Sequence, residues 1–163
     1  MTPHDTPHTP AAPASIPASI PASTLAAAPE PAAAPAEFTA LMQEATAGAE
    51  RFDHRRHVHL TWLAVRRHGR AAALTLVADG IRATATRAGA PQKFHVTMTR
   101  AWVELVARHA TDDEDFTAFA DRHPDLFDKG LLARHYRPGT LADDRARTEW
   151  IEPDLKPFDR QPS

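Results

Sequence analysis

The composition changes sharply near residue 36, and this change confines any folded domain to the rest of the chain. Residues 1–36 hold nine of the fifteen prolines and no lysine or arginine. Prolines interrupt helix and sheet, and the few large apolar side chains here are too few for a core. The sequence therefore predicts a disordered Pro/Ala-rich arm over 1–36, a helical domain over 37–155 and a C-terminal tail over 156–163.

Apolar residues recur at helical spacing throughout the expected domain. The periodicity predicts helices over 37–47, 54–68, 71–88 and 92–109, and shorter helical segments between residues 116 and 150. Gly69 and Gly89 are expected to end helices, and Asp53 to cap one. The predicted fold is all-α, a single compact bundle of five or six helices. Short loops predict that neighbouring helices run antiparallel.

Three histidines fall within six residues of the segment FDHRRHVHLTWL, at His54, His57 and His59. On a helix, His54 and His57 share a face with apolar residues, whereas His59 lies on the opposite, basic face. His59 is therefore expected at the surface. The inward pair has two interpretations: partly buried imidazoles bonded to backbone or water, which the pair alone favours, or ligands of a functional site.

His95 supplies a third inward imidazole, on the apolar face of the helix expected over 92–109. A buried histidine needs a partner, which can be a hydroxyl, a carbonyl, a carboxylate or a metal. Neutral imidazoles suit Fe, Zn or Cu, and three protein ligands with an open position are the usual catalytic arrangement. The sequence thus predicts a mononuclear site for a divalent transition metal at His54, His57 and His95. Satisfied core histidines are the alternative.

Two hydroxyl groups are candidates for a catalytic role beside such a metal. Thr99 lies on the same helical face as His95, and Tyr136 is the only tyrosine of the chain. Either hydroxyl would orient a substrate. A tyrosine in this position more often packs its ring at the edge of the core and bonds its hydroxyl there.

Charge and missing motifs exclude several classes of function. Acidic and basic residues balance after residue 36, which argues against a dedicated nucleic-acid binder. The chain has no cysteine, no Gly-rich phosphate loop and no HExxH, and it lacks a calcium-loop motif. No apolar run is long enough to span a membrane, and no signal-peptide pattern is present, so we expect a soluble, cytoplasmic protein. Abundant Arg, Ala and Pro are typical of GC-rich bacterial genomes.

Four segments resemble a group of small helical bacterial proteins of unassigned function: FDHRRHVHLTWL, KFHVTMTRAW, HPDLF and ARTEWIEPDL. The resemblance covers roughly residues 50 to 155. Its HxxH and FH-x-T-x-T motifs fall on His54, His57, His95, Thr97 and Thr99. The resemblance implies a helical fold and gives weight to the same three histidines, but it implies no activity.

The leading hypothesis is a small metal-dependent enzyme, for example of bacterial specialised metabolism, that acts on a small-molecule substrate through the histidine-lined site. The reaction itself is left open by the sequence. The alternative is a non-enzymatic helical interaction module with structural histidines, in which a basic face meets an anionic partner; this face holds Arg55, Arg56, Arg66 and Arg67. No specific nucleic acid and no membrane are expected as partners, and homo-oligomerisation is left open.

The expected domain, about 120 residues long, is large enough to bury around two-thirds of its chain surface without the arm. Deleting residues 1–34 should therefore leave the cooperative thermal melt and the helical circular-dichroism signal per folded residue nearly unchanged. A collapse of the melt in the truncated chain would show that the arm packs against the domain.

Overall fold

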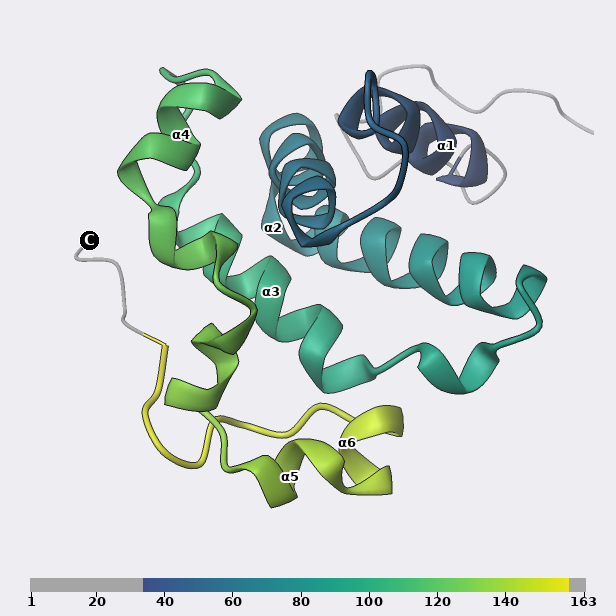
Figure 1. Ribbon diagram of the computed structural model, residues 1–163, viewed down its shortest axis with the longest axis vertical. Helices are drawn as coiled ribbons and strands as arrows, with labels where there is room; N and C mark the ends of the chain where they lie inside the picture. Colours follow the sequence, from purple (N-terminus) through teal and green to yellow (C-terminus); the bar gives the residue numbers. More distant parts are fainter. Residues whose placement is uncertain (1–33, 159–163) are drawn as a thin grey trace, which may run out of the picture.

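The computed structural model describes residues 34–158, which form an all-α fold without strands, as predicted (Figure 1). Of the expected arm, residues 1–33 lie outside the described residues, and residues 34–36 begin the first helix. The elements in chain order are α1 (Ala34–Ala45), α2 (His54–Arg87), η1 (Pro91–Lys93), α3 (Val96–His109), α4 (Phe116–Arg122), η2 (Pro124–Phe127), η3 (Lys129–Arg134), α5 (Pro138–Ala142) and α6 (Asp144–Thr148), where η marks a 3₁₀ helix.

A sharp bend at Gly69 divides α2 into two arms whose axes point in different directions. Gly69 has φ 78° and ψ 167°, a conformation open essentially to glycine alone, so the predicted helix break at this residue is confirmed. The prediction that the helices over 54–68 and 71–88 run antiparallel is wrong, because they are the two arms of this bent helix. Figure 1 shows the first arm end-on and the second running across the view. A hairpin needs several loop residues, whereas one non-helical residue only redirects the axis.

The core lies where α1 and α3 pack against α2. Each of these helices buries an apolar stripe, with Leu41 from α1, Leu60 and Val77 from the two arms of α2, and Val103 from α3 all completely covered. Burial of such a side chain stabilises the fold by about 1.5–3 kcal/mol. Among the described helices, none has the length and apolar character needed to cross a membrane.

Buried hydrogen bonds fasten the C-terminal segment to the beginning of α3. The hydroxyl of Thr97 donates to the carbonyl oxygen of Glu149 at 2.6 Å and accepts from the backbone N–H of Ile151 at 3.1 Å. Further on, Phe158 is buried in the same core. The threonine that the resemblance singled out at position 97 therefore holds two chain segments together.

Helices α1 and α2 approach closely at Gly80. A Cβ atom at Gly80 would overlap the ring of Phe38, which is itself buried. We expect Gly80→Ala to lower the free energy of unfolding by about 1–3 kcal/mol through overpacking, although alanine favours a helix. Gly139→Ala is the matched control in a helix, because nothing lies within 4 Å of its added Cβ. Urea unfolding of both variants measures the difference, and equal stabilities would contradict the close approach.

Candidate functional site

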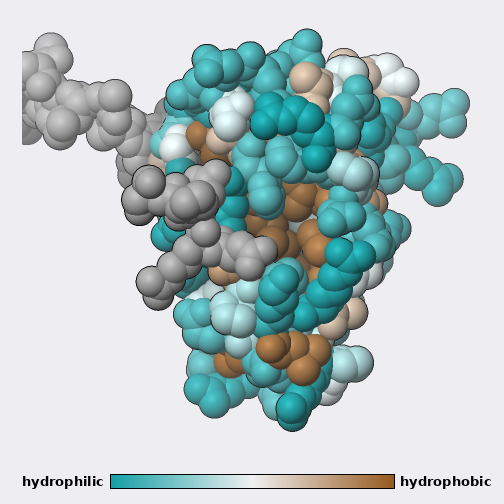
Figure 2. All heavy atoms as spheres, turned by 90° about the vertical axis from the view of Figure 1, so that its left-hand side faces the viewer, coloured by the Kyte–Doolittle hydropathy of each residue, from teal (hydrophilic) through white to brown (hydrophobic). Residues whose placement is uncertain are grey.

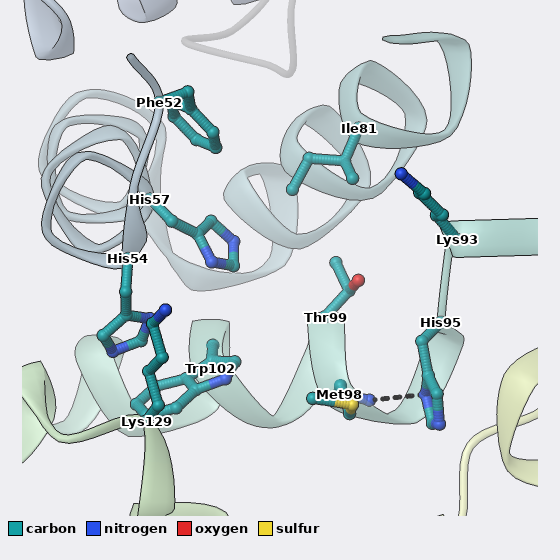
Figure 3. Close-up of a pocket in the computed structure, with 10 residues that line it drawn as sticks. All are labelled: Phe52, His54, His57, Ile81, Lys93, His95, Met98, Thr99, Trp102 and Lys129. Atoms are coloured by element: carbon teal, nitrogen blue, oxygen red, sulfur yellow. Dashed lines mark hydrogen bonds between the residues drawn. The ribbon is translucent and has the colours of Figure 1, made fainter. Parts of the chain in front are cut away.

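A pocket of about 340 Å³ opens between the two arms of α2 and the beginning of α3 (Figure 3). Its lining combines three histidines, two lysines and one threonine with apolar side chains: Phe52, His54, His57, Ile81, Lys93, His95, Met98, Thr99, Trp102 and Lys129. No carboxylate is among these residues. The bend at Gly69 creates this pocket, because it places Ile81 of the second arm on the same cavity as His57 of the first.

His57 lines this pocket and has a polar atom without a partner. Figure 3 shows its ring directed into the cavity from α2, and its Nε2 is buried without a hydrogen-bond partner. Burial, with the neighbouring His54 adding to it, lowers the pKa of His57 to about 4. The imidazole is therefore neutral at pH 7. An unsatisfied buried polar atom costs about 1–3 kcal/mol, which a hydrogen-bonding ligand would offset.

His54 shares the pocket with His57 but has a partner within the chain. Its Nε2 lies 2.9 Å from the carbonyl oxygen of Leu126. Because a carbonyl only accepts, this nitrogen carries the proton. The ring packs edge-on against Trp102, with centroids 4.5 Å apart. Burial lowers the pKa of His54, and the Leu126 carbonyl partly opposes that effect.

His95 does not sit on the apolar face of a helix, as the sequence pattern predicted. It precedes α3 and caps it: its Nδ1 accepts from the backbone N–H of Met98 at 3.1 Å, and its Nε2 donates to the carbonyl oxygen of Leu141 at 2.8 Å. Both ring nitrogens are thus engaged. The helical wheel failed here because η1 interrupts the expected helix and because histidine is not among the preferred N-cap residues.

The three histidines do not form a common metal centre. Ring centroids of His54 and His57 are 6.4 Å apart, and Figure 3 places His95 at the other end of the pocket. Within residues 34–158, no group of three or more His, Asp or Glu side chains is arranged to hold a metal ion. The divalent Fe, Zn or Cu ion predicted from the sequence therefore has no support in this geometry.

The two hydroxyl candidates have different positions. Thr99 is buried and lines the pocket, as Figure 3 shows. Tyr136 is absent from the lining, is completely covered, and donates its hydroxyl to the carbonyl oxygen of Ile151 at 2.8 Å. Burial is the main reason that the pKa of Tyr136 is raised. Its geometry is that of a core tyrosine, the alternative interpretation of the sequence.

Sequence reasoning missed the cations of the pocket. Lys93 and Lys129 are two of the three lysines in an arginine-rich chain, and both line the cavity. Neither forms an ion pair with any acid in the described part of the chain. The scarcity of lysine was the only signal in the sequence that could have drawn attention to them. The side chains that line the pocket thus include two cations and no carboxylate.

The basic face of α2 is largely engaged within the molecule. Arg66 donates to the carbonyl oxygens of Glu114 at 2.8 Å and Asp112 at 2.7 Å, and Arg67 pairs with Glu44. Also on this face, His59 is half-buried, less exposed than expected, and its ring stacks on a phenylalanine ring of α4 with centroids 3.9 Å apart. These contacts hold α1, α2 and α4 together.

The lowered pKa of His57 predicts a pH dependence of stability. Between its ordinary pKa of 6.5 and about 4, the unfolded chain takes up a proton that the folded chain excludes. Stability is therefore complete above about pH 6.5 and falls by roughly 3 kcal/mol as the pH drops to 4. We expect His57→Phe to lose this component. Urea unfolding between pH 7.5 and 4 measures it, and identical slopes in both proteins would contradict a buried neutral imidazole.

Comparison of the chain with protein-family models, with curated proteins and with solved structures found no match. The resemblance drawn from the four sequence segments therefore stays a prediction. The function of this chain has to be argued from its own geometry.

Proposed function

We propose that the pocket binds a small, largely apolar organic molecule that carries an anionic or hydroxyl group. The observation that carries this proposal is His57, whose ring points into the pocket and whose Nε2 is buried without a hydrogen-bond partner. A ligand hydroxyl can donate to this nitrogen or accept from it, and a carboxylate accepts from it in the tautomer that has the proton on Nε2. Because burial keeps the imidazole neutral at pH 7, the bond forms without a change in the charge of His57.

The remainder of the lining matches such a ligand. Phe52, Ile81 and Trp102 give apolar walls that would surround an aromatic or aliphatic body. Lys93 and Lys129 add two positive charges that the lining does not balance. An organic acid fits this combination of apolar walls and cations better than a neutral hydrocarbon or a cation does.

The two functions predicted from the sequence find less support. A metal-dependent reaction needs a third ligand beside His54 and His57, and both ring nitrogens of His95 are already engaged. An interaction module needs a free basic face, but Arg66 and Arg67 form bonds inside the chain. Binding of a small organic acid requires neither a third metal ligand nor a free basic face.

Benzoate is the first probe, because it combines an aromatic body with one carboxylate. We expect calorimetric titration of the full chain at pH 7 to give saturable binding that is stronger than for acetate, which lacks the ring. His57→Phe should weaken benzoate binding about tenfold, equivalent to about 1.4 kcal/mol. His59→Phe is the matched control, a half-buried imidazole on the same helix outside this pocket, and should leave the affinity unchanged.

Two results would oppose this proposal. Equal losses in His57→Phe and His59→Phe would place the binding elsewhere. Stoichiometric Fe, Zn or Cu in the tag-free protein, measured by elemental analysis and lost in His54→Ala and His57→Ala, would favour the metal-dependent enzyme instead.

A further inference from the structure

A second cavity, of about 320 Å³, lies between the C-terminal part of α3 and the segments η2 and η3. Figure 2 views the molecule from the side of α4 and η2, and shows apolar atoms at the bottom of a hollow ringed by hydrophilic side chains. The cavity shares no residue with the first pocket; it is lined by Leu105, Arg108, His109, Arg122, His123, Pro124, Asp125, Leu126, Leu131, Arg134, His135 and Lys156.

Basic side chains predominate in the lining of this second cavity. The lining includes three arginines and one lysine but a single carboxylate, that of Asp125. One of the arginines, Arg108, is paired at 3.0 Å with the buried Glu104. Arg134 pairs with Asp125 at 3.5 Å, and the two side chains are 58% and 72% exposed. Arg122, 60% exposed, pairs at 2.7 Å with Glu114, whose side chain is only 6% exposed. The Arg134–Asp125 pair, with both partners exposed, contributes at most about 1 kcal/mol, so a ligand anion can replace Asp125 at little cost.

His123, which lines the cavity, has one ring nitrogen without a hydrogen-bond partner. Its Nε2 is buried without a hydrogen-bond partner, and its ring lies 4.6 Å from that of His109. The neighbouring His135 is fixed, because its Nδ1 donates to the carbonyl oxygen of Lys156 at 2.7 Å. An oxygen-rich group placed here would bond His123 and reach the guanidinium groups at the rim.

We infer that the second cavity binds a phosphate monoester of a small organic molecule. The planar donor fork of arginine matches phosphate oxygens in a bidentate way, and a dianion makes use of several cations at once. The leucines of the lining, Leu105, Leu126 and Leu131, offer an apolar floor for the organic part of the ester. This site is separate from the proposed organic-acid pocket and does not depend on it.

Phenyl phosphate tests the inference, with inorganic phosphate and phenol as partial probes. The titration uses the full chain and its His57→Phe variant, because the first pocket also attracts anions. We expect both proteins to bind phenyl phosphate equally at the second site, and more tightly than they bind either partial probe. Arg134→Gln should weaken this binding about tenfold.

Arg145→Gln is the matched control, since Arg145 also forms an exposed pair with an acid, Glu149 at 3.0 Å, but lies outside the cavity. It should leave the affinity for phenyl phosphate unchanged. His123→Gln should weaken binding while the thermal melt confirms that the variant is folded. No binding at millimolar phenyl phosphate, or equal losses in Arg134→Gln and Arg145→Gln, would overturn the inference.

Discussion

The bend at Gly69 is the constraint on which the rest of the molecule depends. The positive φ at Gly69 redirects the chain so that both arms bury side chains in the core, Leu60 from the first and Val77 from the second. The same bend gives the first pocket two walls from one helix, with His57 on one arm and Ile81 on the other.

Hydrogen-bond partners, not residue type, determine what each histidine does. His54 bonds the carbonyl oxygen of Leu126, and His95 uses both nitrogens to join α3 to α5. Only the Nε2 atoms of His57 and His123 are buried histidine nitrogens without a partner in the described chain. These two histidines line different cavities, and each proposed ligand would complete the hydrogen bonding of one of them.

The two cavities lie on either side of the η2–η3 segment and differ in chemistry. Leu126 accepts from His54 through its backbone while its side chain lines the second cavity, and Lys129 lines the first. The first pocket has mostly apolar walls with two cations, which suits an organic acid. The second has a cationic rim above an apolar floor, which suits a phosphate ester. A short stretch of chain therefore supports both sites.

The sequence by itself determined the helical class, because apolar residues recur at helical spacing and Gly69 can adopt a backbone conformation that other residues avoid. It also indicated His54, His57 and Thr99, all of which line the first pocket. Only the tertiary structure decided that His95 caps a helix, that Tyr136 bonds Ile151, and that Lys93 and Lys129 line the same cavity. These outcomes depend on which distant backbone carbonyl or side chain comes within reach, and periodicity along the chain carries no information about such long-range contacts.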